Sequence, residues 1–287
     1  MKAMKPKMLW QCIYPILIHL GISFALGFGY SFLYMIVFIL QNPEQRDMET
    51  VTNQVMDSYL NNGLYIMAAT AIITIPIFYF LWRGRRKRDG ILWQREQGKG
   101  NWMLLVLMSA CLCISFNSLI GYSGLEQFSK SYQQTAEILY SGGIFLELAV
   151  VGVLAPVCEE LMFRGMIFEN LCHCMKPITA GVISSLMFAI YHGNLVQGVY
   201  AFCIGCMLAF FCKRYGGILA PMMAHITANV VSVCITEVDL IRNLFEDSIT
   251  SIVLTILTTL IWIGGTAILM KKISNNFWEK VMKKGAK

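Results

Sequence analysis

The sequence predicts an all-α, polytopic membrane protein, a bundle of about eight transmembrane helices around a buried polar cavity. Hydrophobic residues make up 56% of the 287 residues and charged residues only 14%, against roughly 25% in an average soluble domain. The apolar residues gather in runs of about 18 or more with almost no charge, long enough for a helix to cross a bilayer. We expect a single integral membrane domain over 1–287, because no polar stretch is long enough to fold alone.

The transmembrane helices are expected where these apolar runs fall, with polar segments between them. In chain order the runs cover about 10–40, 63–82, 102–122, 142–173, 178–191, 195–212, 218–236 and 249–270. The first run is longer than a bilayer requires, so we expect this helix to tilt or to begin in the interface. Pro156 lies in the fourth run and should open the backbone there, a break that is tolerated where a helix lines a cavity.

The charged residues between the runs indicate how the chain crosses the membrane. Lys and Arg are in excess before residue 10, at 83–101, before Pro177, at 213–217 and after 270, whereas 41–62, 123–141 and 237–248 form neutral or acidic loops. Because cytoplasmic loops carry the excess of Lys and Arg, this alternation predicts both termini in the cytoplasm. The net charge of +6 therefore indicates topology, and no nucleic-acid partner is expected. The basic tail also suggests a short interfacial helix, through Ile273, Phe277, Trp278 and Val281.

Two acids and an arginine lie inside the apolar fourth run: Glu159, Glu160 and Arg164. Ionisable side chains are costly in a membrane span and mark a functional site by default. Glu160 and Arg164 are four residues apart and can form an ion pair along one helical face. Glu159 lies about 100° round the helix and is left free of the arginine. A purely structural ion pair is the alternative interpretation, but it leaves the spare carboxylate unexplained.

Two of the four histidines have a companion four residues away on the same helical face. His192 follows Phe188 at the end of the fifth run, and His225 precedes Asn229 in the seventh. From helical rise, Glu159 and His192 lie roughly 24 Å and 22 Å from the same cytoplasmic turn and can meet. His225 lies only roughly 12 Å from its turn and needs tilt or a cavity to join them.

The other two histidines, His19 and His173, have no polar partner at helical spacing, so we interpret them as locally satisfied or interfacial. A free carboxylate beside a histidine can deprotonate water. A second histidine and an asparagine amide can donate hydrogen bonds to a developing oxyanion. Together these residue types favour machinery that adds water to a carbonyl group.

The ordered motifs Glu159-Glu160-x-x-x-Arg164, Phe188-x-x-x-His192 and His225-x-x-x-Asn229 resemble the CPBP (CAAX protease and bacteriocin-processing, or Abi) family of intramembrane proteases. That family includes the type II CAAX prenyl endopeptidases and bacterial bacteriocin-processing or self-immunity proteins. The resemblance covers 142–236, the expected catalytic core. It implies a glutamate-type endopeptidase that hydrolyses a peptide bond of a membrane-associated or lipidated peptide or protein.

The same resemblance implies a role for each motif residue. The catalytic set would be Glu159, Glu160, His192, His225 and Asn229, with Arg164 and Phe188 as structural residues. Glu159 and His192 would activate the water, and His225 and Asn229 would form the oxyanion site. Glu160 and Arg164 would orient the helix.

The family is described both as glutamate-type and as metal-dependent, so zinc is considered. Two glutamates and two histidines could bind zinc, with Glu159, His192 and His225 as candidate ligands. The sequence has no His-Glu-x-x-His motif, and the acid–base interpretation needs no metal. We therefore favour hydrolysis without a required cofactor.

Two non-proteolytic functions stay open at this point. A bacteriocin self-immunity or peptide-binding membrane protein could use the same cavity, and a small proton-coupled transporter could use buried Glu, Arg and His as a relay. The chain shows no inverted repeat, which disfavours the transporter. The expected partners are membrane lipid and a peptide or lipidated protein substrate, with the oligomeric state open. A short chain without a sorting tail such as KDEL favours a bacterial plasma membrane.

Overall fold

The computed structural model describes residues 6–45, 47–88, 101–246 and 248–271. This part of the chain is helical and contains no strand, which confirms the all-α prediction. The elements are α1 (Pro6–Gln41), α2 (Met48–Arg88), α3 (Trp102–Ser123), α4 (Leu125–Phe128), α5 (Lys130–Leu139), α6 (Ile144–Glu147), η1 (Leu148–Leu154), α7 (Ala155–Glu160), η2 (Leu161–Phe168), α8 (Glu169–Leu171), α9 (Pro177–Tyr191), α10 (Leu195–Tyr215), α11 (Leu219–Glu237), α12 (Asp239–Glu246) and α13 (Ser248–Lys271).

Every predicted run is helical, but the count of eight spans is only approximate. Six described helices are long and apolar enough to cross a membrane, and a seventh span results if α5 and Ile144–Leu171, bent by 104°, count as one. The remaining run is α9, whose 15 residues reach roughly 22 Å, less than the hydrocarbon thickness of roughly 30 Å. The polytopic helical bundle is confirmed, with six to seven full spans in the described residues.

The polar segments are less loop-like than the sequence suggests. α2 begins at Met48 because Asp47 caps it, its Oδ2 accepting a hydrogen bond of 3.0 Å from the Thr50 amide. The expected loop 123–141 contains α4 and α5, and the acidic segment 237–248 contains α12. At the other end of α2 the helix runs on to Arg88. The expected interfacial helix at 273–281 lies outside the described residues.

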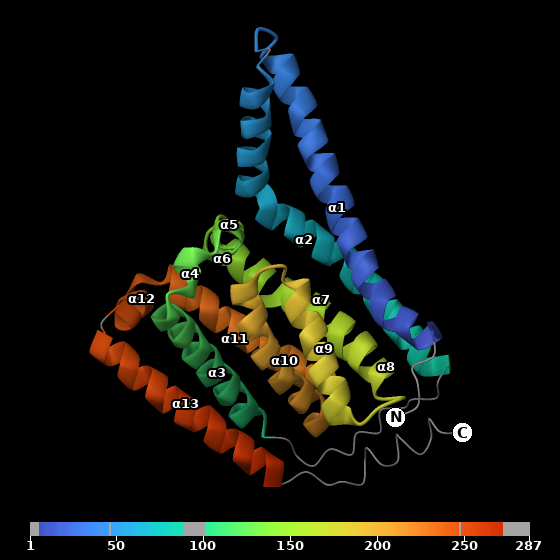
Figure 1. The fold of residues 1–287 in the computed structure, drawn as a ribbon, viewed down its shortest axis with the longest axis vertical. Helices are drawn as coiled ribbons and strands as arrows, with labels where there is room; N and C mark the ends of the chain where they lie inside the picture. Colours follow the sequence, from blue (N-terminus) through green and yellow to red (C-terminus); the bar gives the residue numbers. More distant parts are fainter. Residues whose placement is uncertain (1–5, 46, 89–100, 247, 272–287) are drawn as a thin grey trace.

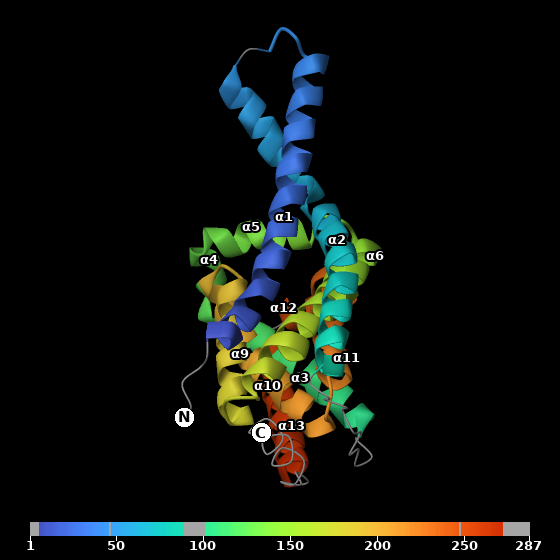
Figure 2. The ribbon, with the colours of Figure 1, turned by 90° about the vertical axis from the view of Figure 1, so that its right-hand side faces the viewer.

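The bundle consists of a long hairpin and a body of packed helices (Figure 1). α1 and α2 pack against each other, and the tip of their hairpin extends beyond the rest of the molecule in both views (Figures 1 and 2). In the body α13 packs on α3, α3 on α11, and α11 on α10, which pairs with α9. The first helix begins and the last helix ends at the same end of the molecule (Figure 1).

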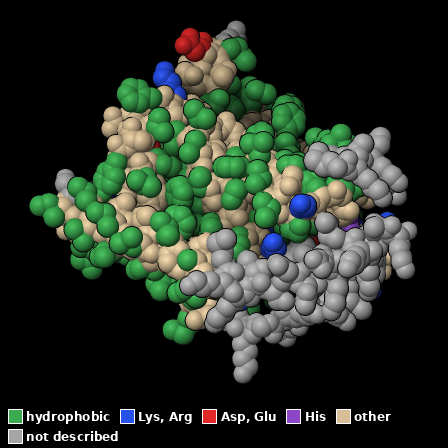
Figure 3. Space-filling model, turned by 60° about the horizontal axis from the view of Figure 1, so that its bottom comes forward, with side chains coloured by type: hydrophobic (Ala, Val, Ile, Leu, Met, Phe, Trp, Pro, Cys, Tyr) green, Lys and Arg blue, Asp and Glu red, His purple; other side chains and the backbone are tan. Residues whose placement is uncertain are grey.

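The surface of the bundle is largely hydrophobic. Side chains of this kind cover much of the face in Figure 3, with only a few Lys and Arg among the described residues there. Large apolar side chains are exposed along α1 and α13, such as Phe24 at 73% and Leu260 at 62%. Soluble monomers rarely expose such continuous apolar surface, whereas lipid-facing helices require it.

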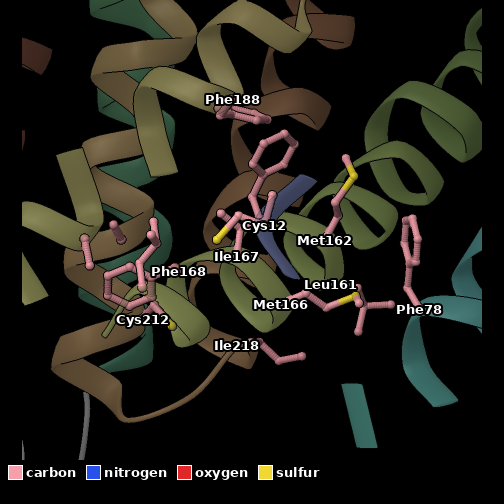
Figure 4. Close-up of a cluster of buried hydrophobic side chains, with 14 of the residues drawn as sticks. Cys12, Phe78, Leu161, Met162, Met166, Ile167, Phe168, Phe188, Cys212 and Ile218 are labelled. Atoms are coloured by element: carbon pink, nitrogen blue, oxygen red, sulfur yellow. The ribbon is translucent and has the colours of Figure 1, made fainter. Parts of the chain in front are cut away.

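The core of the body is built on η2. Every side chain of Leu161–Phe168 is buried, and helices from distant parts of the sequence surround it. Cys12 of α1, Phe78 of α2, Phe188 of α9 and Cys212 of α10 belong to the same cluster (Figure 4). The segment with the charged motif is therefore the centre of the hydrophobic core.

The backbone around the motif is wound as a π-helix on both sides of α7. Pro156 stands in the first turn of α7 and has no amide hydrogen, and the preceding Ala155 amide donates to the Val150 carbonyl five residues earlier. The break predicted at Pro156 is thus a change of helix type without an interruption. After α7, Arg85 of α2 donates hydrogen bonds of 2.8 Å to the carbonyls of Gly165 and Met166 in η2. π-Helical turns are rare and often accompany functional sites.

Small residues let α9 and α10 approach each other closely. A Cβ added at Gly181 would lie 3.2 Å from the Ala209 Cβ, and one at Gly205 would lie 3.0 Å from the Ser185 Cβ. Close approach through small residues is the usual basis of helix packing in membranes. It brings the Gly205 carbonyl within 3.0 Å of the Arg164 guanidinium, which donates a hydrogen bond to it.

Substituting Gly205 should therefore destabilise the bundle. Gly205→Ala places a methyl group against Ser185 and 3.3 Å from the Arg164 Nη2, and should lower the free energy of unfolding by about 1–3 kcal/mol. Gly264→Ala is the matched control, because nothing lies within 4 Å of its added Cβ, and helix propensity favours alanine by about 1 kcal/mol. Denaturation of both variants in detergent micelles measures the difference. Equal stability of the two would contradict the packing described.

Candidate active site

The buried Glu160–Arg164 ion pair predicted from the sequence is present. The Arg164 Nη1 donates a hydrogen bond of 2.8 Å to the Glu160 Oε1, and neither side chain has any exposed surface. The Arg164 Nη2 donates to the Gly205 carbonyl, and the guanidinium carbon lies 4.7 Å from the centre of the Phe188 ring. The arginine thus links the motif helix to α9 and α10.

His225 of α11 lies between the two acids. Its Nδ1 donates a hydrogen bond of 2.9 Å to the same Oε1 of Glu160, and its Nε2 lies 3.7 Å from the Oε2 of Glu159. The edge-on Phe188 ring lies against it, with ring centres 5.7 Å apart. Counted by helical rise from the turn at 213–217, His225 is not deep enough to reach the acids. In the folded protein, however, it contacts both of them.

Glu159 and Glu160 differ in their access to the interior cavity. The Glu160 side chain is fully buried and one of its oxygens bonds both Arg164 and His225, whereas the Glu159 side chain is 16% exposed and lines a cavity. The predicted asymmetry between the two acids is therefore seen in their geometry.

His192 ends α9 and is held by its own helix. Its Nδ1 lies 2.8 Å from the Phe188 carbonyl, so the proton sits on Nδ1 and Nε2 remains as an acceptor. The ring stands nearly perpendicular to the Phe188 ring, at 88° with centres 4.6 Å apart. Phe188 therefore separates and orients three charged or polar groups at once: Arg164, His192 and His225.

Asn229 lies one turn after His225 on α11. Its Nδ2 donates a hydrogen bond of 2.9 Å to the Val151 carbonyl in η1. This bond uses one of the two amide hydrogens and leaves the other and the amide oxygen available. Asn229 also ties α11 to the π-helical segment before the motif.

One cavity of about 330 Å³ brings the predicted residues together. Glu159, Phe188, His192, His225 and Asn229 all line it, whereas Glu160 and Arg164 lie behind its wall. Neither Lys nor Arg occurs among the described lining residues, and Glu159 is the one carboxylate there. The other polar lining residues are His19, Ser23, Asn117, Thr135, Tyr140, Tyr191, Gln197, Tyr200 and Ser232. The site is thus a partly open pocket within an apolar bundle, lined by both polar and apolar side chains.

His19 is the residue that sequence reasoning placed wrongly. It lines this cavity from α1, and its Nδ1 lies 3.5 Å from the Sγ of Cys158, next to Glu159. Helical spacing offers it no polar partner, which favours a locally satisfied histidine. The partner is 139 residues away in the chain, so no local pattern signals it. His173, by contrast, is not among the residues that line the cavity.

The residues of the site do not fit a bound zinc ion. Within the described residues no three His, Cys, Asp or Glu side chains are grouped closely enough to hold a metal. Of the candidate ligands Glu159, His192 and His225, the last already has Nδ1 on Glu160 and Nε2 facing Glu159.

The part of the chain that carries the motifs is similar to known proteins. Residues 141–231 match the family model "Type II CAAX prenyl endopeptidase Rce1-like", and all motif residues from Glu159 to Asn229 fall inside the match. The chain is 29% identical to the "Putative membrane peptidase YdiL" of Bacillus subtilis (strain 168) over 133 residues, which are 46% of this chain and 53% of that protein. It is also 29% identical to the "Uncharacterized 24.3 kDa protein" of Escherichia coli over 93 residues, which are 31% of this chain and 43% of that protein.

The chain thus spans about half the length of the curated relatives it matches. No solved structure matches it. The resemblance to the CPBP and CAAX protease family, inferred from the three motifs, is confirmed by the family match and by the similarity to a membrane peptidase.

The buried ion pair predicts a large cost for removing one partner. Arg164→Met leaves the Glu160 carboxylate buried without its cation and should lower the free energy of unfolding by about 3–5 kcal/mol. Lys87→Met is the control, because Lys87 is exposed near the end of α2. Denaturation in detergent micelles compares the two variants with the wild type. A variant Arg164→Met as stable as Lys87→Met would show that the pair does not support the fold.

Proposed function

We propose that this protein is an intramembrane endopeptidase that hydrolyses a peptide bond of a membrane-associated or lipidated substrate. The observation that carries the proposal is the division between the two adjacent acids. Glu160 is occupied by Arg164 and His225, and Glu159 lies beside His225 and faces the cavity that His192 also lines. The family match supports a protease at this position in the chain.

In the proposed reaction Glu159 is the general base. Its carboxylate takes a proton from a water molecule whose oxygen attacks the carbonyl carbon of the scissile peptide bond. His192 contributes its free Nε2, which accepts the second hydrogen of the water and orients it. When the tetrahedral intermediate collapses, the carbon–nitrogen bond breaks, and the proton held by Glu159 passes to the leaving amine.

His225 and Asn229 are proposed to stabilise the negative oxygen of the intermediate. A doubly protonated His225 makes the buried cluster neutral, because two carboxylates then face one guanidinium and one imidazolium. A neutral cluster is the least costly arrangement in a membrane interior. The second amide hydrogen of Asn229 adds a neutral donor from the same face of α11.

The cavity favours an uncharged stretch of substrate. Glu159 is its one carboxylate, no described lining residue is Lys or Arg, and both ring nitrogens of His225 already face Glu159 and Glu160, so a free carboxylate of the substrate would find no unpaired cation there. We therefore propose cleavage at an internal bond, in a CAAX-type prenylated protein or in a bacterial leader or bacteriocin peptide. A bacterial plasma membrane with both termini cytoplasmic is the proposed location, supported by the basic and acidic segments of the sequence.

Loss of the base should abolish turnover without unfolding the protein. Glu159→Gln and His192→Gln should each lower kcat/KM by about 10²–10⁴, the usual contribution of acid–base catalysis. The assay is cleavage of an internally quenched, farnesylated CAAX peptide by the protein in liposomes, and melting in detergent reports the fold. Glu49→Gln and His173→Gln are matched controls away from the cavity.

Full activity in both Glu159→Gln and His192→Gln would overturn the assigned roles. A wild-type protein that binds the peptide without cleaving it would favour the peptide-binding or self-immunity alternative. Cleavage of a bacterial leader peptide in place of the farnesylated peptide would keep the reaction and change the substrate class.

Metal removal provides a separate measurement of the mechanism. Because Glu159, His192 and His225 do not form a metal site with each other, activity after dialysis against EDTA or phenanthroline should equal that of the untreated protein. The control is a known zinc peptidase treated in the same way. Loss of activity that added zinc restores would show that a metal takes part.

A further inference from the structure

His19 lines the cavity from outside the part of the chain that carries the family match. It belongs to α1, whereas the match covers 141–231. Its ring lies between two aromatic side chains, with centres 6.4 Å from Phe78 and 5.7 Å from Tyr191. Tyr191 lines the same cavity and precedes His192. These ring contacts therefore hold the histidine in a defined position on the wall of the cavity.

A chain of hydrogen bonds determines which nitrogen of His19 carries the proton. The Thr74 hydroxyl donates to the Thr70 carbonyl at 2.8 Å, so its oxygen is the acceptor toward the Cys158 Sγ at 3.0 Å. Because Cys158 then donates its single hydrogen to Thr74, its sulfur accepts from the His19 Nδ1 at 3.5 Å. The Nδ1 of His19 is thus protonated, and Nε2 is left as an acceptor.

His19 and His192 therefore have the same tautomer, with the proton on Nδ1. Each is held through Nδ1, one by the Cys158 sulfur and the other by the Phe188 carbonyl, and each keeps Nε2 free at the same cavity. His192 lines the cavity together with Glu159, the proposed base, and is proposed to orient the water. His19 needs a different partner, which must be a hydrogen-bond donor.

A peptide inside this cavity supplies such donors. Its backbone N–H groups lose contacts with water when they enter a pocket within an apolar bundle, and each one that finds no acceptor is costly. Glu159 and His192 are used by the attacking water in the proposed reaction. The Nε2 of His19 is a further acceptor, and His19 contacts Cys158, the residue before Glu159.

We propose that His19 positions the substrate by accepting a hydrogen bond at Nε2 from a backbone N–H of the bound peptide. This inference rests on the proposed endopeptidase function and assigns α1 a part in substrate binding. Cys158 supports it indirectly, because its sulfur keeps the proton of His19 on Nδ1.

The test uses the farnesylated peptide assay with the full-length protein in liposomes. His19→Phe keeps a ring between Phe78 and Tyr191 but removes the acceptor, and should raise KM about fivefold to tenfold, as for one lost hydrogen bond, with kcat unchanged. His19→Gln, which restores an acceptor, should recover part of the loss. His173→Phe is the control, because His173 does not line the cavity.

A scan of the peptide separates positioning from a structural role. In each probe one backbone nitrogen is methylated, which removes a single N–H donor. One such probe should show a raised KM with the wild type and no additional loss with His19→Phe. A His19→Phe variant with wild-type KM, or with the same additional loss for every methylated probe, would overturn the proposal.

Two further measurements separate a failure of the His19 proposal from a failure of the proposed function. Nitrogen-15 spectra of histidine-labelled wild-type protein should show His19 protonated on Nδ1, and the opposite tautomer would overturn the proposal without any variant. If the wild type does not cleave the farnesylated peptide, the proposed substrate class and this inference fail together. If it cleaves the peptide and Glu159→Gln does not, an unchanged KM in His19→Phe rejects the role of His19 alone.

Discussion

The positions of the other site residues depend on the fully buried guanidinium of Arg164. It bonds Glu160 on its own helix and the carbonyl of Gly205 on α10, and it lies over the Phe188 ring of α9. Glu160 in turn holds His225 of α11. A buried ion pair contributes little net stability, because desolvation offsets its attraction, but it tolerates few geometries. Three helices therefore take their positions at the cavity from one cation on the motif helix.

This arrangement divides the two adjacent acids between structure and chemistry. Because Glu160 is used by Arg164 and His225, Glu159 is the carboxylate that remains for the cavity. Cys158, the residue before it, contacts α1 and α2 through His19 and Thr74. Three consecutive residues of α7 thus point to three different neighbours. A short helical segment in the middle of the core can in this way orient groups from most of the bundle.

Local spacing predicted those parts of the site that depend on local geometry. The pairing of Glu160 with Arg164 follows from their separation of four residues, and so does the freedom of Glu159. The position of His225 did not follow from helical rise, because that count assumes helices perpendicular to the membrane that start at one level, whereas His225 meets both acids across helices packed together in the fold. The contact of His19 with Cys158 depends on two helices that pack only in the folded protein.

The helix types and boundaries show the same limit. Asp47 is a capping residue and signals the early start of α2, but the polar composition of 48–62 concealed it. The π-helical winding of η1 and η2 has no signature in hydrophobic periodicity, because nearly every side chain there is apolar. Pro156 was the one local sign that the backbone changes near the motif.

The π-helical segments also bear on how this sequence can change over time. A π-helical turn accommodates one more residue than an α-helical turn between the same contacts, so it behaves as an insertion absorbed inside a helix. A deletion among Leu161, Met162 and Phe163 could be absorbed if the π-helical turn returned to an α-helical one, but it would place Arg164 three residues after Glu160 and turn its side chain by about 100° away from its partners. A substitution on a lipid-facing helix changes few contacts, whereas a change in the length of this segment alters at once the contacts of Arg164 with Glu160, α9 and α10.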